Sequence, residues 1–391
     1  MSQDKPQKSE TQAIRTQIRR TSQQEHSAPV FMTSSYTFES AEQARALFAN
    51  EIEGNVYSRY SNPNTDEFIR KMCLLEQAEE GVATASGMSA VFSSLAGLLN
   101  NGDHVLASRS LFGSSHQILT TILPRWGITH SYGDIYHPET WEDLIQENTR
   151  VLFIETPSNP GLDLIDLEWA GQLAQKHKLI LIVDNCFATP CLQQPMTFGA
   201  DVVVHSATKF IDGQGRAIGG VIVGKQKYLA DIKFFTRHSG PALSPFNAWL
   251  FSKSLETLSV RMERHCSNAL QLAEFLESHP NVESVRYPFL ESHPQHELAR
   301  KQMKMGGGIV VFTIKGGYDQ AKVFLDRLQM LSLSANLGDT RTIATHPAST
   351  THSKLTEEER QSVGITPGLI RISTGLENID DIIADIKQAL A

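Results

Sequence analysis

Short apolar runs alternate with segments of helical periodicity through the middle of the chain. Four of these runs are typical of buried strands, and they cover residues 104–107, 151–154, 179–183 and 202–204. Between them, the pattern of apolar residues predicts helices over 114–123 and 167–177. Strands that alternate with helices indicate a mainly parallel sheet with helices on both faces. The pattern therefore predicts an α/β fold.

The pattern differs on either side of this region. Before it, a helix with one apolar face is expected to begin at Thr65 and to end near Gly81, and an apolar helix follows over 90–99. After about Pro245 the expected elements are a helix over 248–276, a strand over 309–314, a helix over 319–328, a strand over 369–372 and a last helix capped by Asn378. This mixture is typical of a second, smaller α+β domain.

Three parts of the chain are therefore expected. Residues 1–62 are polar and cannot bury a core alone, so we expect an arm that contacts a neighbouring subunit. Residues 63–246 form the large domain, and residues 247–391 form the smaller C-terminal domain.

Composition excludes several classes of function. The 391 residues carry a formal net charge of −8 and give a pI of about 6.0, which argues against a basic surface for nucleic acid. No apolar run approaches the roughly 18 residues that a membrane span needs. The first 25 residues lack the hydrophobic centre of a signal peptide. We expect a cytoplasmic protein without nucleic-acid or membrane partners.

The cysteines do not indicate a structural or metal role. The chain has four, too few for a disulfide scaffold. Cys186 and Cys191 are not accompanied by a second pair of ligands, so we expect no metal site.

The most informative stretch for chemistry is the end of the strand over 202–204. Ser206, Thr208 and Lys209 follow this strand directly, and Asp184 ends another strand 25 positions before the lysine. Ligands of such sheets bind beyond the carboxyl ends of the strands. A lysine after a strand usually points into water, and S-x-T-K alone is a weak signal. The matching aspartate makes a site more probable than a solvated loop.

These residues meet the demands of pyridoxal phosphate. Its aldehyde forms a Schiff base with an amine, which Lys209 offers, and its pyridine nitrogen needs a carboxylate to stay protonated, which Asp184 offers. Phe112, at a strand-to-helix turn, can stack on the ring. Hydroxyls, helix-start N–H groups and a cation for the phosphate are available at Ser86, Gly87, Met88, Ser206, Thr208 and Arg59. No G-x-G-x-x-G follows the first strand, which argues against a nicotinamide or flavin site.

The same motifs resemble the Cys/Met-metabolism family of pyridoxal-phosphate enzymes, with the aspartate-aminotransferase type of fold (fold type I). The stretches that carry the resemblance are 57–59, 86–88, 155–160, 183–185, 205–209 and 369–373. The resemblance implies that Tyr57 and Arg59 reach the phosphate in a neighbouring subunit, that Asn159 lies near the ring hydroxyl, and that Arg371 clamps the substrate α-carboxylate. It also implies at least a dimer, and usually a tetramer of two dimers.

Three further stretches resemble one branch of the family, the O-succinylhomoserine sulfhydrylases. They are residues 110–113, 209–216 and 335–339. This branch implies γ-replacement of succinate by sulfide to give homocysteine, a step of methionine biosynthesis. Cystathionine γ-synthases and γ-lyases usually carry tyrosine where Phe112 stands, serine where Asn336 stands, and a different loop after the lysine.

The residues leave alternatives open. O-acetylhomoserine sulfhydrylase, cystathionine γ-synthase or γ-lyase, and a binding protein without cofactor all remain candidates. We assign Asn336 and Arg371 to substrate binding, and add Arg216 as a candidate for the distal succinyl carboxylate. It is equally probable that Arg216 is an ordinary loop arginine whose side chain points into water.

Overall fold

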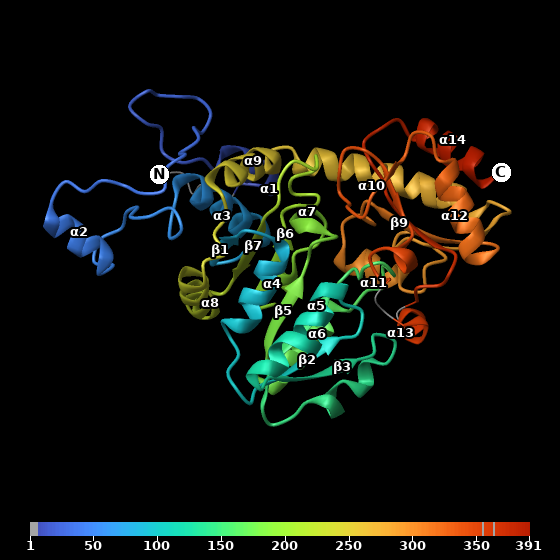
Figure 1. The fold of residues 1–391 in the computed structure, drawn as a ribbon, viewed down its shortest axis with the longest axis horizontal. Coiled ribbons are helices and arrows are strands. Elements are labelled where there is room, and N and C mark those ends of the chain that lie inside the picture. The colour runs from blue at the N-terminus through green and yellow to red at the C-terminus, as the bar shows by residue number, and fades with distance from the viewer. Residues whose placement is uncertain (1–6, 354–355, 363) are drawn as a thin grey trace.

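Two sheets, each covered by helices, make up the protein. The computed structural model describes residues 7–353, 356–362 and 364–391. The large sheet has seven strands in the order β1-β7-β6-β5-β4-β2-β3, and the small sheet has five in the order β10-β11-β12-β9-β8 (Figure 1). The strands of the large sheet are β1 (Glu80–Thr84), β2 (His104–Ser108), β3 (Thr129–Gly133), β4 (Thr149–Glu155), β5 (Ile180–Asp184), β6 (Val202–Ser206) and β7 (Gly220–Gly224).

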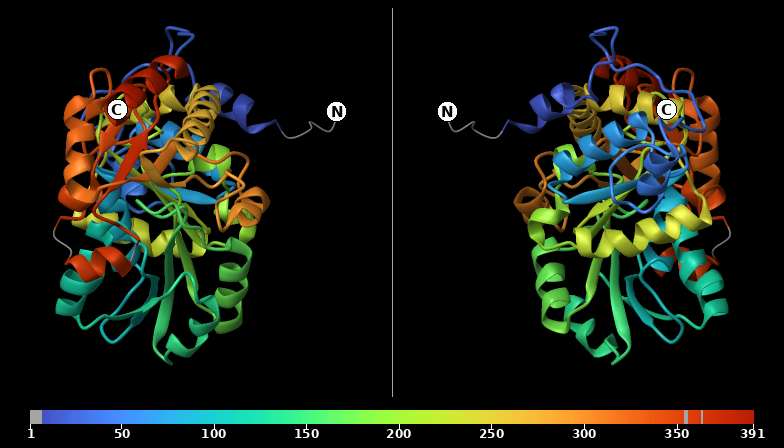
Figure 2. Two further views of the ribbon diagram at one scale, coloured as in Figure 1. Left: turned by 90° about the vertical axis from the view of Figure 1, so that its right-hand side faces the viewer. Right: turned by 90° about the vertical axis from the view of Figure 1, so that its left-hand side faces the viewer.

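The centre of the large sheet is parallel, as the pattern predicts. Neighbouring strands from β3 through β2, β4 and β5 to β6 are parallel, whereas β7 is antiparallel to both β6 and β1. Helices cover both faces (Figure 2), which is why the central strands are apolar on both sides. The mainly parallel sheet with a separate smaller sheet confirms the predicted α/β fold class.

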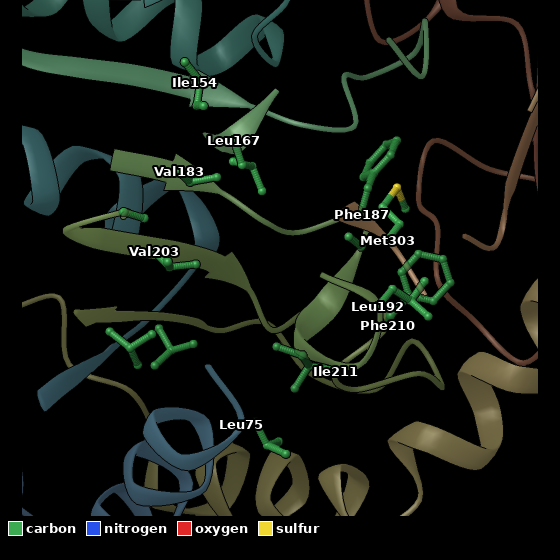
Figure 3. Packing of buried hydrophobic residues seen from close by; sticks show 14 of the residues in the cluster. Leu75, Ile154, Leu167, Val183, Phe187, Leu192, Val203, Phe210, Ile211 and Met303 are labelled. Carbon is green, nitrogen blue, oxygen red and sulfur yellow. The ribbon is translucent and has the colours of Figure 1, made fainter. Parts of the chain in front are cut away.

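Two apolar clusters lie against the two faces of the large sheet. One includes side chains of α3 (Pro63–Glu76), α6 (Leu167–His177) and α9 (Pro245–Leu255); Figure 3 shows Val183 and Val203 of the sheet within it. The other includes side chains of α4 (Gly87–Ala96) and α8 (Gln226–Ser239). The remaining helices of this part are α5 (Gly113–Gln117) and α7 (Thr189–Leu192).

Local capping fixes the starts of the helices next to the sheet edge. Asn62 caps α3 in a capping box with Thr65, and Pro63 occupies the first helical position. Ser86 caps α4 in the same way with Ser89. The helix predicted from Thr65 therefore begins two residues earlier, and it ends at Glu76 because Gln77 takes a left-handed conformation.

The C-terminal region packs helices on the small sheet. Its strands are β8 (Val282–Arg286), β9 (Ile309–Ile314), β10 (Ser332–Leu333), β11 (Ile343–Thr345) and β12 (Leu369–Ser373). Its helices are α10 (Leu258–Glu277), α11 (His296–Gln302), α12 (Gly317–Arg327), α13 (Glu357–Ser362) and α14 (Ile379–Leu390). Asn378 caps α14, as predicted, by accepting a hydrogen bond from the backbone N–H of Asp380.

The single helix predicted over 248–276 is wrong. The structure has two helices, α9 and α10, separated at Glu256 and Thr257. Side chains from other segments bind the last carbonyls of α9: Lys71 donates to the Ser252 carbonyl at 3.1 Å, and Arg261 donates to the Ser254 carbonyl at 2.9 Å. Because these partners replace intrahelical bonds, the break is stable, and no local sequence signal marks it.

The N-terminal region is less uniform than the sequence predicts. It contains α1 (Ser9–Arg15) and α2 (Ala41–Phe48), and Figure 1 shows α2 standing away from the body. Tyr57 and Arg59 lie at a turn, which the Tyr60 N–H closes by donating to the Tyr57 carbonyl at 2.8 Å. Whether residues 1–62 contact a neighbouring subunit, and whether the predicted domain boundaries hold, stay predictions.

Among the described residues, no helix combines the length and apolarity that crossing a membrane requires.

Phe68 tests the packing of α3 on α9. Its side chain is fully buried and its ring centroid lies 5.4 Å from that of Phe251. We expect Phe68→Ala to lower the free energy of unfolding by about 3–5 kcal/mol, because it removes buried apolar surface and leaves a cavity. Urea unfolding followed by circular dichroism measures the change. Phe234→Ala is the control, since that ring is 69% exposed; equal losses in both variants would contradict this account of the core.

Candidate active site

A cavity of about 340 Å³ lies at the carboxyl ends of β4, β5 and β6. Residues of the C-terminal region, including Ala335 and Arg371, complete its wall. Ten of the predicted site residues line it: Ser86, Gly87, Met88, Phe112, Asn159, Asp184, Ser206, Thr208, Lys209 and Arg371. The structure thus brings together residues that lie up to 285 positions apart in the chain.

The start of α4 forms one end of the cavity. Its first N–H groups have no partner within the helix, so they are available to an anion. A Cβ added to Gly87 would lie 2.5 Å from the Ser206 Cβ, so only glycine lets α4 approach β6 this closely. The Thr208 hydroxyl hydrogen-bonds with the Gly219 backbone, at 3.2 Å from its N–H and 3.3 Å from its carbonyl. Small residues and hydroxyls here form a cradle of the size and polarity that a phosphate needs.

Two carboxylates lie side by side at the other end. Asp184 of β5 pairs in register with Glu155 of β4. The Cys186 N–H donates to Asp184 Oδ1 at 3.0 Å, and the Phe112 N–H donates to Glu155 Oε2 at 2.7 Å. Burial raises the pKa of Asp184 to about 6, and burial together with the charge of Asp184 raises the pKa of Glu155 well above its ordinary value.

A pair of buried acids favours a bound cation. A protonated pyridine nitrogen would supply one N–H donor and one positive charge at this position. Asp184 would thereby gain a second hydrogen bond and a charge opposite to its own. With the phosphate cradle at α4, this pair fits pyridoxal phosphate. From the sequence, Glu155 was considered only within the stretch 155–160 and was not assigned to the site. Its position at the end of a buried strand was the signal that could have identified it.

Lys209 lies between these two ends. Its amine donates to Asn336 Oδ1 at 2.7 Å. Burial, and in addition the positive charge of Arg371, lower the pKa of the Lys209 amine below its ordinary value. With a lower pKa, a larger fraction of the amine is unprotonated near neutral pH, and this is the form that acts as nucleophile and base. Asn336 does not line the cavity, but this hydrogen bond places it at the lysine.

Arg371, on β12, is 1% exposed and has neutral partners. It donates to Asn159 Oδ1 at 2.9 Å and to the carbonyls of Ala335 and Asn336 at 3.3 Å each. Burial lowers its pKa to about 10, which leaves the guanidinium charged at neutral pH. Its Nε is buried without a hydrogen-bond partner among the residues that the structure describes. A buried cation with spare donors can bind a carboxylate bidentately.

Arg216 lies elsewhere. Its guanidinium donates to Asp212 Oδ1 at 2.9 Å and to the Ser254 hydroxyl, and it is not among the residues that line the cavity. The suggestion that it binds a distal carboxylate is therefore not supported by the geometry. The physical reason is that Asp212 is fully buried and needs a partner for its charge, which Arg216 provides.

Tyr57 and Arg59 also lie outside this cavity. They line a second hollow, of about 460 Å³, with Ser34 and Ser58 of the same region and with residues 242–245. Arg59 stacks on the Tyr57 and Tyr60 rings at 5.5 and 4.7 Å and donates to the Arg237 carbonyl. Within one chain, these two residues do not meet Lys209.

The described residues contain no group of three or more histidine, cysteine or acidic side chains that could hold a metal ion.

The chain is similar in sequence and in structure to known proteins. The chain is 49% identical to O-succinylhomoserine sulfhydrylase of Pseudomonas aeruginosa, over 98% of this chain and 95% of the relative. It is 42% identical to L-methionine gamma-lyase of Porphyromonas gingivalis, over 93% of this chain and 92% of the relative. A crystal structure of a putative O-acetylhomoserine (thiol)-lyase from Campylobacter jejuni superposes with a TM-score of 0.94 at 37% identity, covering 98% of this chain and 99% of that one. That crystal structure contains N'-pyridoxyl-lysine-5'-monophosphate.

Gly87→Ala tests the cradle at α4. The added Cβ must push α4 away from Ser206, which misplaces the N–H groups at the helix start. We expect the affinity for pyridoxal phosphate to fall about tenfold or more, the equivalent of one charge-assisted hydrogen bond. Titration of the apoprotein with the cofactor measures this. Gly113→Ala is the control, because its Cβ would meet only the Thr351 carbonyl at 3.8 Å; a similar loss there would show that the close approach at Gly87 is not the cause.

Asp184→Asn tests the cost of the buried acid. Burial raises the pKa of Asp184 from 3.8 to about 6, so in the apoprotein its ionisation opposes folding. This destabilisation is absent below about pH 4, grows between about pH 4 and 6, and is complete above. We therefore expect Asp184→Asn to stabilise the apoprotein above pH 6 while weakening cofactor binding. Urea unfolding of both apoproteins across pH 4–8 measures the difference; the same gain at pH 4 as at pH 8 would contradict it.

Nearly the whole chain matches one protein family. The sequence model of the Cys/Met metabolism PLP-dependent enzymes matches residues 10–391. This match confirms the resemblance and the cofactor predicted from the motifs. The chain belongs to the Cys/Met metabolism family of PLP-dependent enzymes.

Proposed function

We propose that the protein transfers the homoserine moiety of O-succinyl-L-homoserine to sulfide, giving L-homocysteine and succinate. The observation that carries this choice is the similarity, along nearly the whole chain, to O-succinylhomoserine sulfhydrylases. This reaction would place the enzyme in methionine biosynthesis by direct sulfhydrylation, in the cytoplasm.

Four residues that line the cavity have roles in this reaction. Bound pyridoxal phosphate supplies an electron sink that stabilises negative charge on the amino-acid substrate. The Lys209 amine takes and returns protons at Cα and Cβ, and Asp184 holds the proton of the pyridine nitrogen. Arg371 binds the α-carboxylate, and Asn159 orients Arg371 through their 2.9 Å hydrogen bond. The Cγ–O bond breaks, succinate leaves, and sulfide forms the new bond to Cγ.

Phe112 supports a carboxylate leaving group. It lines the cavity and offers a ring face for stacking, but it has no hydroxyl to donate a proton. Succinate leaves as a stabilised anion and needs little protonation, unlike a thiolate. Phe112 therefore favours an acyl-homoserine substrate over the C–S bond cleavage of γ-lyases, and Asn336 stands where these enzymes usually carry serine.

The position of Tyr57 and Arg59 supports a homo-oligomer. Both face a hollow away from the Lys209 cavity of their own chain. We propose that they complete the phosphate site of a second copy, which requires at least a dimer, and that two such dimers form a tetramer.

One assay separates the candidate reactions. Homocysteine formation is measured with O-succinyl- and O-acetyl-L-homoserine and sulfide. Cystathionine formation is measured with the same esters and cysteine, and 2-oxobutyrate formation is measured from L-methionine alone. We expect the highest kcat/KM with the succinyl ester and sulfide, and no activity in Lys209→Ala. Preference for the acetyl ester, for cysteine or for methionine breakdown would replace the proposal by the corresponding alternative. Activity retained in Lys209→Ala would contradict the role of the lysine.

A further inference from the structure

A second acid, which does not line the cavity, is paired with a histidine of the cavity wall next to Asp184. Glu76 is the last residue of α3, His205 lies on β6, and both side chains are fully buried. Their Oε1 and Nε2 atoms are 2.6 Å apart. A distance this short is typical of a charge-assisted hydrogen bond. A fully buried carboxylate also needs a compensating positive charge. In the charged form of the pair, the Glu76 carboxylate and the His205 imidazolium compensate each other.

The pair is tied to both strands that carry the cofactor residues. Asn185, which follows Asp184, donates from Nδ2 to the same Glu76 oxygen at 2.8 Å. His205 immediately precedes Ser206 of the phosphate cradle. Glu76 Oε1 thus binds both Asn185, which follows Asp184, and His205, which precedes Ser206. The hydrogen bond from the Asn185 N–H to the Val204 carbonyl, at 3.1 Å, closes the connection between the strand ends.

His205 stands next to Asp184. Asp184 pairs in register with Val204, the neighbour of His205, and both Asp184 and His205 belong to the wall of the cavity. Nε2 of His205 contacts Glu76, and its Nδ1 is buried without a hydrogen-bond partner among the described residues. A positive imidazolium here lies close enough to lower the pKa of Asp184, against the larger effect of burial.

We propose that the buried Glu76–His205 ion pair keeps Asp184 anionic, and so keeps the pyridine nitrogen of the bound cofactor protonated. Glu76 and His205 are positioning residues, since neither is assigned a contact with substrate. Glu76 stabilises the positive charge on His205, and His205 in turn stabilises the negative charge on Asp184. The effect depends on the cofactor and not on which ester or thiol reacts. The test of this proposal is therefore independent of the test of the proposed reaction.

Other charged groups around Asp184 would act against this or leave it unchanged. Glu155 of β4 opposes a second negative charge, and the Cys186 thiol, whose pKa burial raises well above its ordinary value, stays neutral near neutral pH. Lys209 lies on the loop after β6, where its amine binds Asn336. Besides these groups, His205 is the titratable side chain behind Asp184 that can bring a positive charge.

The experiment uses the holoenzyme loaded with pyridoxal phosphate labelled with 15N in the ring. The 15N chemical shift separates a protonated from an unprotonated pyridine nitrogen. In Glu76→Gln the side chain keeps its shape and can still accept from Asn185, but the charge on His205 is no longer stabilised. The pKa of Asp184 then rises, the pKa of the ring nitrogen falls, and we expect the signal to move toward the unprotonated value between pH 7 and 8. Turnover should fall about 10-fold or more, the range known for outer partners of a site.

Glu67→Gln is the matched control. Glu67 is a second buried acid on α3, 3.2 Å from the Lys71 amine and hydrogen-bonded to the Ser252 hydroxyl, and it is not among the residues of the cavity wall. We expect it to lower stability and to leave the 15N signal at the wild-type value. His205→Gln serves as a second variant if Glu76→Gln does not fold, and it should move the signal in the same direction.

Two results would overturn the proposal. One is an unchanged 15N signal in Glu76→Gln and His205→Gln, even with reduced turnover, because this would assign the pair a structural role only. The other is a folded variant, shown by circular dichroism, that no longer binds the cofactor, because the phosphate cradle and Lys209 should be sufficient for binding.

Discussion

The constraint on which the site depends is that Asp184 must be an anion at a largely buried position in the wall of the cavity. Burial opposes this and raises its pKa to about 6. The protein supplies the Cys186 N–H, and we propose that it also supplies the His205 cation, to offset the cost. A positively charged ring nitrogen completes the balance. Cofactor binding and the ionisation of Asp184 are thus linked. In the apoprotein the ionised Asp184 destabilises the fold, and binding of the cofactor offsets this cost.

The second requirement is that the two sheets stay packed together. Arg371 and Asn336 come from the C-terminal region, and Lys209 from the large sheet. Arg261 of α10 holds the loop after the lysine, donating to the Phe210 carbonyl at 2.6 Å and to the Ile211 carbonyl at 3.2 Å. A Cβ on Gly338 would lie 2.5 Å from the Phe210 nitrogen, so that glycine permits the close contact between the regions. Arg371 and Lys209 are therefore held in one arrangement.

The parts of the fold that were predictable have strong local signals. The central strands are apolar on both faces and were expected nearly where they occur. The helices α3 and α4 were expected from their apolar periodicity, and the caps Asn62 and Ser86 place their starts at Pro63 and Gly87, two and three residues earlier. β7 and β1 were missed, since their strand assignment comes from antiparallel pairing with each other and with β6. Arg216 was assigned to substrate because the loop sequence cannot show that Asp212 is buried and takes the guanidinium.

The sequence by itself determined the fold class, the cofactor and most of the residues around it, because each of these depends on residue type and short-range spacing. Lys209 after a buried strand, Asp184 at the end of another and Gly87 at a helix start are local facts that chemistry can interpret. Only the tertiary structure decided which charges meet. Glu155 beside Asp184, Glu76 behind His205, and Arg216 on Asp212 join separate strands, helices or loop turns, and such partners follow from packing rather than from sequence spacing.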